Sequence, residues 1–245
     1  MNIKRHSKKL IKKAIEKSGF ELRRKLNQNT PTLSSALCRL KRREVDFNTV
    51  IDIGASNGCW SAELMKHFPE VNYLLIEAQP IHEPALKQFC HQHSNAQYVL
   101  AAAGAEESKI FFDITDPFGG VASYEPFKQN CISVPVTTVD LQVKRHDLPP
   151  PYLLKLDTHG FEIPIFEGAI NTLPQANVLI VECYNFNIAP ECILFSDMCR
   201  YLEGHGFRCV DMYDLLYRPY DESFWQMDIL FVKAKRKEFS YTQYQ

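Results

Sequence analysis

Residues 50–58 read V-I-D-I-G-A-S-N-G, and the fold that we expect for the chain is built around them. An apolar strand ends here at an acidic residue, and Gly54 and Gly58 follow it. Gly54 lets the backbone turn tightly and approach a ligand, while Gly58 allows close packing where the next helix begins. The spacing is D-x-G-x-x-x-G, without the G-x-G that cradles a pyrophosphate. A dinucleotide site is therefore disfavoured.

Outward from this stretch, apolar strands alternate with helical segments. The predicted strands are residues 48–53, 72–77, 97–102, 152–157, 177–183 and 207–212, with helices at 59–67, 81–92, 162–171 and 193–204. Such apolar strands, separated by helices, are typical of a parallel sheet buried on both faces. Two segments break the alternation: 108–138 reads as short strands and a loop, and 225–232 as a closing strand. We predict an α/β fold: a doubly wound, mostly parallel seven-stranded sheet with an insertion before its fourth strand and an antiparallel last strand.

Charge divides the chain into two parts. Residues 1–43 hold 14 of the 28 Lys and Arg but only two acidic side chains, a net charge of +12. Residues 44–245 hold 14 basic and 27 acidic side chains, a net charge of −13. We therefore expect a basic helical N-terminal extension over 1–43, with helices at 3–18 and about 33–43, followed by one large domain over 44–245.

Several classes of protein are excluded by composition. No apolar run approaches the roughly 18 to 20 residues that span a bilayer, and the N-terminus has no secretory signal. The eight cysteines include no C-x-x-C pair, so neither a disulfide framework nor a zinc site is expected. We predict a cytoplasmic protein whose residues 1–26 could contact an anionic membrane at its inner face, since basic side chains are attracted to such a surface.

Carboxylates end the first two predicted strands, Asp52 the first and Glu77 the second. Ligands of such sheets bind beyond the carboxyl ends of the strands. Glu77 can accept hydrogen bonds from both hydroxyls of an adenosine ribose, and Asp52 can influence an ammonium group directly or through water. Because the glycine loop offers no pyrophosphate cradle, these residues favour S-adenosylmethionine, which has a ribose and an amino-acid end but no phosphate.

The stretch L-K-L-D-T-H-G-F-E over 154–162 carries the predicted chemistry. Asp157 ends the fourth strand and so should lie at the mouth of the cleft. Methyl transfer from a sulfonium is an in-line displacement that needs chiefly alignment. A hydroxyl acceptor must also lose its proton, and Asp157 or His159 is placed to take it. Gly160 permits the turn, and Glu162 begins a helix, where the dipole favours an acid.

The chain resembles the FkbM-type methyltransferase family over about residues 45–235. The resemblance is carried by the stretches quoted above and by I-E-A-Q-P (76–80), V-T-T-V-D-L (136–141), the continuation of 154–162 to F-E-G-A at 166–169, and Q-M-D-I-L-F-V (226–232). The resemblance implies methyl transfer from S-adenosylmethionine, usually to oxygen on sugars or other secondary metabolites. It implies cofactor positions at Asp52, Gly54, Gly58 and Glu77, and further recurrent positions at Asp140, Lys155, Asp157, Gly160 and Glu162. The end of the third strand departs from the pattern, because it reads A-A-A-G without an acid for the adenine amino group.

The predicted site residues fall into three groups. The catalytic candidates are Asp157 and His159. The cofactor-binding candidates are Asp52, Gly54, Ser56, Gly58, Glu77, Ala102 and Ala103, with backbone groups near the last two holding the adenine. The substrate candidates are Gly119, Gly120, Tyr124, Glu162 and Tyr184. No metal is predicted, although Asp157 with Glu182 could serve if their carboxylates were close.

We therefore expect an S-adenosylmethionine-dependent O-methyltransferase that acts on a hydroxyl of a sugar, glycolipid or secondary metabolite. A nucleic-acid methyltransferase guided by the basic arm is a second hypothesis, weakened because the arm offers only Phe20 for stacking on bases. A non-catalytic module that binds S-adenosylmethionine or a partner protein is a third. Steep loss of activity with salt would identify the second, because phosphate contacts release counterions.

Overall fold

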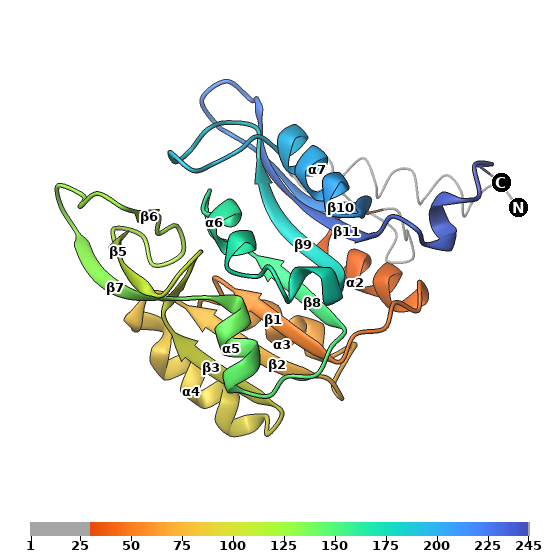
Figure 1. The fold of residues 1–245 in the computed structure, drawn as a ribbon. Coiled ribbons are helices and arrows are strands. Elements are labelled where there is room, and N and C mark those ends of the chain that lie inside the picture. Colours follow the sequence, from red (N-terminus) through yellow and green to blue (C-terminus); the bar gives the residue numbers. More distant parts are fainter. Residues whose placement is uncertain (1–29, 245) are drawn as a thin grey trace, which may run out of the picture. The chain divides into compact units, whose positions relative to one another are not determined.

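A computed structural model describes residues 30–244 (Figure 1). The α-helices are α2 (Leu33–Arg42), α3 (Cys59–Met65), α4 (Glu83–Gln92), α5 (Val139–Arg145), α6 (Glu162–Glu167) and α7 (Phe195–Gly204). The strands are β1 (Thr49–Ile53), β2 (Asn72–Glu77), β3 (Ala96–Leu100), β4 (Ala102–Ala103), β5 (Ser108–Asp113), β6 (Ala122–Ser123), β7 (Cys131–Thr137), β8 (Tyr152–Leu156), β9 (Ala176–Tyr184), β10 (Phe207–Tyr217) and β11 (Phe224–Lys233). Short 3-10 turns are η1 (Pro80–His82), η2 (Leu173–Gln175) and η3 (Lys237–Phe239).

The main sheet has seven strands in the order β10-β11-β9-β8-β1-β2-β3. The pairings among β9, β8, β1, β2 and β3 are all parallel, whereas β11 is antiparallel to both β9 and β10. The predicted α/β class, the seven strands and the antiparallel last strand are confirmed, and the sheet as a whole is mixed. The chain runs outward from β1 to β3 and returns to β8 on the other side of β1, so the carboxyl ends of β1 and β8 border a crevice.

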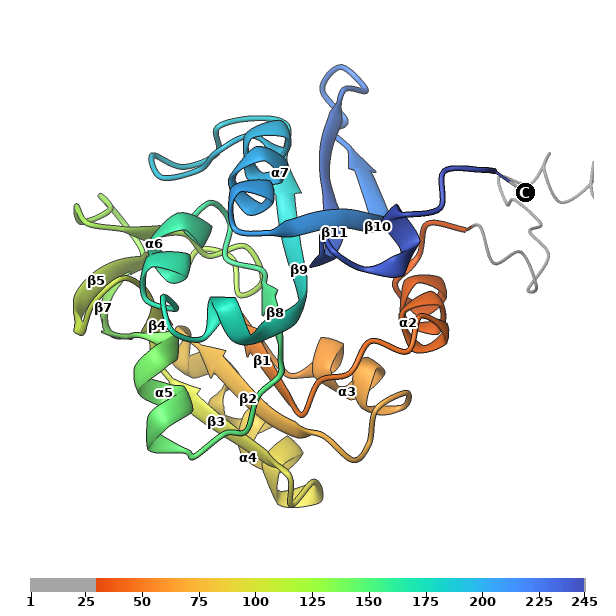
Figure 2. The ribbon, with the colours of Figure 1, turned by 45° about the vertical axis from the view of Figure 1, so that its right-hand side comes forward.

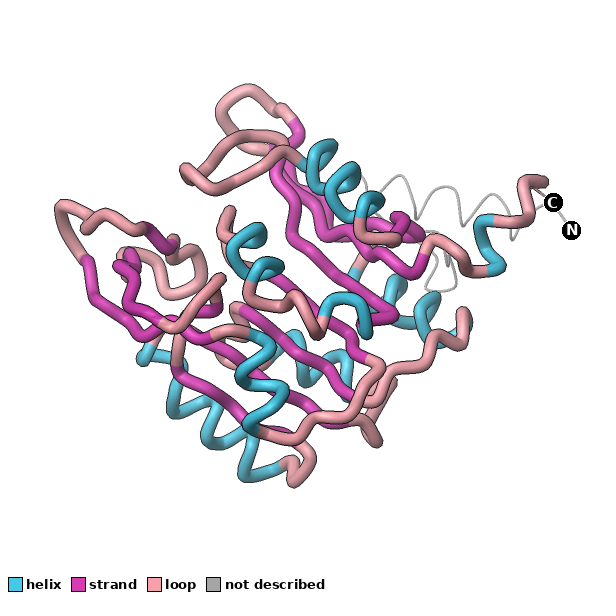
Figure 3. Tube along the Cα trace, viewed as in Figure 1, coloured by secondary structure: helices cyan, strands magenta, loops and turns pink. Residues whose placement is uncertain are grey.

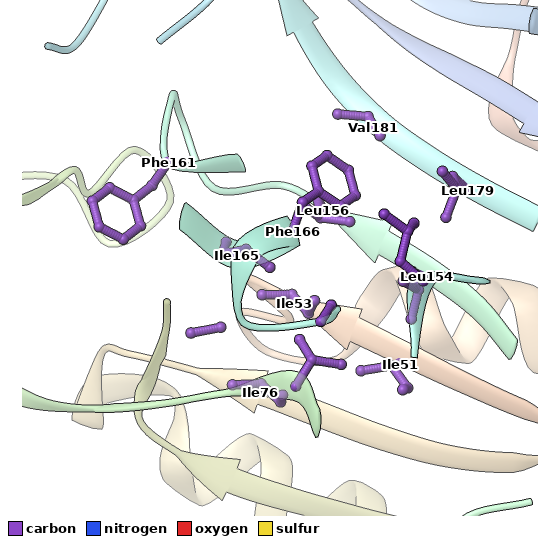
Figure 4. Packing of buried hydrophobic residues seen from close by; sticks show 14 of the residues in the cluster. Ile51, Ile53, Ile76, Leu154, Leu156, Phe161, Ile165, Phe166, Leu179 and Val181 are labelled. Atoms are coloured by element: carbon purple, nitrogen blue, oxygen red, sulfur yellow. The ribbon is translucent and has the colours of Figure 1, made fainter. Parts of the chain in front are cut away.

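Side chains of the central strands alternate between two hydrophobic clusters. Ile51 and Ile53 of β1 join the cluster that includes α5, α6 and α7, and Figure 4 shows them beside Leu154 and Leu156 of β8. Val50 points the other way, into the cluster that includes α2, α3 and α4. Helices thus lie on both faces of the main sheet, as the two ribbon views show (Figures 1 and 2). Each fully buried aliphatic side chain contributes about 1.5–3 kcal/mol, so this double burial holds the strand ends in fixed positions.

A second, four-stranded sheet has the order β4-β7-β5-β6 and is visible beside the main sheet in Figure 3. It accounts for the segment 108–138 that was predicted as short strands and a loop. The predicted third strand at 97–102 is divided, because β3 stays in the main sheet while β4 pairs with β7. The prediction missed α5, which follows directly on the β-branched end of β7; the Thr138 side chain accepts a hydrogen bond from the Leu141 N–H and begins the helix. The helix predicted at 162–171 ends at Glu167.

The predicted helix near 33–43 is α2, and it packs against the main domain. Ala36, Leu37 and Leu40 are buried in one of the two hydrophobic clusters. Arg39 forms two hydrogen bonds to Asp211 of β10, at 2.6 and 2.8 Å. The predicted helix at 3–18 lies outside the described residues, and the boundary between residues 43 and 44 stays a prediction. Within residues 30–244, no helix is both long enough and apolar enough to cross a bilayer.

Candidate functional site

A cavity of about 570 Å³ opens at the carboxyl ends of β1, β2, β8 and β9. This volume is in the usual range for sites that bind small molecules. The second sheet supplies another wall through residues 117–122. The predicted site residues that line the cavity are Gly54, Ser56, Glu77, Ala102, Ala103, Gly119, Gly120, Asp157, His159 and Tyr184. Those that are not among the lining residues are Asp52, Gly58, Tyr124 and Glu162.

Gly54 lies where the loop after β1 meets the loop after β8. Its φ of +75° is in the left-handed region, and a Cβ built on it would lie 2.0 Å from the backbone oxygen of Asp157. Any side chain here would force the two strand ends apart. The N–H groups of Gly54 and Ala55 both donate to the Ile76 carbonyl, at 3.0 and 3.1 Å. The glycine therefore allows the cavity floor to be built from three strand ends in close contact.

Gly58 has a different role from Gly54. It also has a positive φ, and a Cβ there would contact Leu75 at 3.4 Å and the Phe89 ring at 3.6 Å. It begins α3 and faces the hydrophobic cluster behind the sheet instead of the cavity. Gly58 therefore has the packing role that the sequence indicated, and it does not line the cavity.

Glu77 ends β2 with its carboxylate held inside the cavity wall. One carboxylate oxygen accepts the Ser56 N–H at 2.6 Å and the other accepts the Gln79 N–H at 2.7 Å. Burial raises the pKa of this carboxyl, and the two backbone N–H groups oppose that shift. Each oxygen keeps a second lone pair. The carboxylate is thus fixed in orientation while it can still accept two hydrogen bonds from a diol.

Asp52 lies behind the glycine loop and does not line the cavity. Its Oδ2 accepts a hydrogen bond from Ser61 of α3 at 2.7 Å, and the side chain is fully buried. Burial raises the pKa of Asp52, while Lys155, whose Nζ is 3.7 Å from Oδ1, opposes that shift. The sequence allowed a direct contact between Asp52 and a ligand, but in this position the side chain is not exposed to the cavity. Asp52 is placed to link β1, α3 and Lys155.

Lys155 connects Asp52 to Asp157. It is a buried lysine of β8, and its Nζ donates to Asp157 Oδ2 at 2.7 Å. Burial alone would lower the pKa of this ammonium group, but Asp157 and Asp52 raise it. Burial alone would raise the pKa of Asp157, but Lys155 lowers it below its usual range. Asp157 is therefore an ionised carboxylate that lines the cavity, with Oδ2 held by the ammonium.

His159 and Glu182 complete a cluster with Asp157. His159 Nδ1 donates to the Gly120 carbonyl at 3.0 Å, so its Nε2 faces Asp157 Oδ1 at 3.6 Å and Glu182 Oε2 at 3.5 Å. Burial and the nearby Asp157 raise the pKa of Glu182 to about 9. We call Asp157, His159 and Glu182 the carboxylate–histidine cluster; it lines one part of the cavity wall.

Two side chains hold Glu182, and sequence reasoning missed one of them, Gln226. Tyr184 Oη donates to Glu182 Oε2, and Gln226 Nε2 of β11 donates to Oε1. Gln226 is opposite Tyr184 in the antiparallel pairing of β9 with β11. Glu182 was named only as a possible metal ligand with Asp157, and it lies at the carboxyl end of a predicted strand, as Glu77 and Asp157 do. Gln226 depends on which strand pairs with β9, and nothing in the local sequence signals that.

The remaining predicted substrate residues differ in position. Glu162 is buried and accepts hydrogen bonds from Thr158 Oγ1 and the Gly160 N–H, both at 3.0 Å, so it fixes the loop after β8. Tyr124 is largely exposed and its ring lies 5.7 Å from that of Phe161. Asp140, which the resemblance singled out, joins α5 to the segment after α6 by accepting from Asn171 and Thr172.

Gly119 and Gly120 belong to the wall that the second sheet supplies. A Cβ on Gly120 would lie 2.3 Å from the Phe112 ring and 2.7 Å from Gln79 Nε2. Gln79 Nε2 in turn donates to the carbonyls of Asp116 and Pro117. The loop 116–120 is therefore packed directly against the segment that follows Glu77, which closes the cavity on that side.

Comparisons with known proteins place this site in context. A sequence model of the family described as Methyltransferase FkbM domain matches residues 52–209, more than half of the chain. The search of curated proteins found no match.

Among solved structures the chain is similar to several proteins at low sequence identity. Precorrin-6y C5,15-methyltransferase from Geobacter metallireducens GS-15 shares 15% identity, with 81% of this chain and 86% of that chain covered and a TM-score of 0.42. The Methanococcus jannaschii fibrillarin pre-rRNA processing protein shares 13% identity, with 79% and 69% covered and a TM-score of 0.48. M. capricolum TrmK, in complex with S-adenosyl-homocysteine, shares 11% identity, with 86% and 70% covered and a TM-score of 0.47.

Proposed function

The chain belongs to the FkbM methyltransferase family, and on that basis we propose that it transfers the methyl group of S-adenosylmethionine to a hydroxyl oxygen of a sugar, glycolipid or related secondary metabolite. The observation that carries this proposal is a single cavity whose wall holds both the Glu77 carboxylate and the carboxylate–histidine cluster. The Glu77 carboxylate is suited to bind the ribose of a nucleoside cofactor, and the carboxylate–histidine cluster is suited to accept the proton of a hydroxyl. Transfer of a methyl group from a nucleoside cofactor to a hydroxyl needs both.

S-adenosylmethionine is the cofactor, and the lining residues fit it. The two free lone pairs of Glu77 suit the hydroxyls of the ribose. Ala101, Ala102 and Ala103 line the cavity with small side chains, which leaves space for a flat base against the backbone. Gly54 presents backbone without a side chain at the end of β1, where the amino-acid part would lie. When bound, the cofactor supplies an activated methyl group on a sulfonium.

The acceptor side of the cavity is aromatic. Tyr184 and Trp225 line it, with their rings 6.1 Å apart and nearly perpendicular, and Phe118 lines it from the second sheet. Rigid aromatic side chains offer broad apolar surfaces at low entropic cost. Such walls suit the face of a sugar ring, with its hydroxyls directed at polar groups. We assign Tyr184, Gly119 and Gly120 to acceptor binding on this ground.

The proton of the acceptor hydroxyl goes to the carboxylate–histidine cluster. In the reaction an oxygen–carbon bond forms, the sulfur–carbon bond breaks, and the hydroxyl proton must leave as the oxygen attacks. Asp157 and His159 line the cavity, and Lys155 holds the Asp157 carboxylate in one orientation. Positioning of the two reactants supplies about 7–11 kcal/mol in favourable cases, so this fixed geometry is the main catalytic device that we propose.

Two measurements test the proposal in sequence. Isothermal titration should show one S-adenosylhomocysteine bound per chain, and failure to bind would overturn the cofactor site. Radiolabelled S-adenosylmethionine with a panel of glycosides, glycolipids and hydroxylated metabolites, set against amine and thiol acceptors, should then place the label on oxygen. Label on nitrogen or sulfur alone would overturn the proposed acceptor class.

The cytoplasmic location and the peripheral membrane contact of residues 1–26 stay predictions. The membrane contact is tested by sedimentation with anionic vesicles, in which deletion of residues 1–26 should abolish binding. Vesicle binding unchanged by the deletion would remove the membrane hypothesis.

A further inference from the structure

Three ligand-type atoms converge in the carboxylate–histidine cluster. One ligand atom from each of Asp157, His159 and Glu182 lies within 4.8 Å of the other two. Asp157 and His159 come from the loop after β8, and Glu182 comes from the adjacent strand β9. We propose that this cluster is a binding site for one divalent transition-metal cation of the Mn²⁺ type. Its part in catalysis, though not its existence, rests on the proposed methyl transfer.

The spacing of the atoms is close to what a metal requires. Nitrogen and oxygen ligands lie at about 2.0–2.2 Å from such a cation, so neighbouring ligands lie about 3.0 Å apart in octahedral geometry and about 3.4 Å apart in tetrahedral geometry. His159 Nε2 is 3.6 Å from Asp157 Oδ1 and 3.5 Å from Glu182 Oε2. A shift of a few tenths of an ångström would bring both pairs to ligand spacing.

The orientation of the imidazole gives independent support. A carbonyl only accepts, so the 3.0 Å contact with the Gly120 oxygen places a proton on His159 Nδ1. The other ring nitrogen, Nε2, is then the one that faces the two carboxylates and is available as a metal ligand. Histidines that bind metals usually donate their other N–H to a backbone carbonyl or carboxylate in this way. Gly120 lies outside the cluster and comes from the second sheet, so this contact does not follow from the clustering of acids.

Both carboxylates are also held from behind. Lys155 Nζ donates to Asp157 Oδ2 and leaves Oδ1 for the cluster. Gln226 Nε2 donates to Glu182 Oε1, and Tyr184 Oη uses one of the two lone pairs of Oε2. Outer partners of this kind orient the ligands of a metal. The three ligand atoms are therefore fixed toward a common point.

A neighbouring carboxyl group offers a control for the cluster. Asp228 is opposite Glu182 in the β9–β11 pairing and is not among the three residues whose ligand atoms converge.

The ligand set favours one class of metal. One imidazole nitrogen and two carboxylate oxygens suit Mn²⁺, Fe²⁺ and related ions, whereas Ca²⁺ and Mg²⁺ prefer all-oxygen sites. The remaining coordination positions would face the cavity that the three residues line. A hydroxyl bound there would be acidified, as metal-bound water is, and its proton would pass to Asp157, whose Oδ2 the metal leaves uncoordinated.

The direct test is metal binding by the full chain after removal of metals with a chelator. Electron paramagnetic resonance of added MnCl₂ should show the signal of free Mn²⁺ suppressed up to one equivalent. Glu182→Gln and His159→Gln should each weaken Mn²⁺ binding by tenfold or more. The matched control is Asp228→Asn, which removes a neighbouring negative charge but no ligand atom, and it should change the affinity by less than threefold.

Three results would overturn the site. The wild type could bind no Mn²⁺ at millimolar concentration, both ligand variants could bind Mn²⁺ with the wild-type affinity, or Asp228→Asn could lose as much affinity as the ligand variants do. Circular dichroism of each variant checks its fold, and either ligand variant alone suffices for the comparison. Titration of S-adenosylhomocysteine into the metal-free protein separates this inference from the proposed function. Cofactor binding without Mn²⁺ binding removes only the metal, and the reverse result removes only the cofactor site.

Discussion

The replacement Glu77→Gln is the sharpest single perturbation of the proposed cofactor site. The carboxylate accepts the backbone N–H groups of Ser56 and Gln79, one on each oxygen. A glutamine has one acceptor and one donor at these two positions, so its NH₂ group must face one of the two N–H donors in either orientation. One ribose hydroxyl then loses its acceptor, and the other binds a neutral oxygen in place of a charged one.

The size of the effect follows from these losses. A hydrogen bond to a charged group contributes about 1.5–3 kcal/mol, and the weakening of the second bond adds about 1 kcal/mol. We therefore expect about 3 kcal/mol less binding free energy, which corresponds to about 100-fold weaker affinity at about 1.4 kcal/mol for each factor of ten.

The assay is isothermal titration of S-adenosylhomocysteine into the wild type, Glu77→Gln and a control. The control is Glu83→Gln, the same replacement at the start of α4, where the side chain pairs with Lys87 and does not line the cavity. It should bind as the wild type does. If Glu77→Gln keeps its fold by circular dichroism and binds within threefold of the wild type, the assignment of the ribose to Glu77 is refuted.

Three further predictions concern the site and its support. Gly54→Ala should lower the free energy of unfolding by about 2 kcal/mol or more in urea titrations, because its Cβ would meet a backbone oxygen at 2.0 Å and its φ is positive, whereas Gly204→Ala has open space and should be neutral or stabilising. Asp211→Asn should destabilise the fold by about 1–3 kcal/mol, because it weakens the largely buried pair with Arg39 that joins α2 to β10. Its control, Asp221→Asn, affects a more exposed pair with Arg218 and should leave the unfolding midpoint unchanged. Asp157→Asn should reduce the rate of methyl transfer at least 100-fold and leave S-adenosylhomocysteine affinity within threefold; unchanged turnover would remove Asp157 from the mechanism.

The sequence predicted the parts of the site that depend on a single strand. Glu77 and Asp157 follow apolar runs directly, and the carboxyl ends of parallel strands meet at one edge of a sheet. Gly54 could be recognised for the same reason. These residues reach the cavity because the strand pattern alone fixes where they lie along the sheet.

The position of Asp52 depends on which face of the sheet its side chain joins. Asp52 points toward α3, away from the cavity, because β1 alternates between two apolar faces. Both faces are buried, so no polar side of the strand reveals the alternation. A sheet with one face in solvent would have shown it.

The residues that were missed depend on contacts between distant segments. Gln226 reaches Glu182 only because β11 pairs antiparallel with β9, and His159 is oriented by Gly120 from the second sheet. The 108–138 segment showed short strands but not the β4–β7 pairing that makes it a wall of the cavity. Strand order and register are properties of the whole fold, which local periodicity does not encode.

A crystal structure of the complex with S-adenosylhomocysteine would show how the cavity binds the cofactor product. We expect both ribose hydroxyls within hydrogen-bond distance of the Glu77 carboxylate, the adenine against Ala102 and Ala103, and the sulfur facing the carboxylate–histidine cluster. A nucleoside bound with its ribose away from Glu77, or with its sulfur on the side opposite the cluster, would refute the proposed cofactor site.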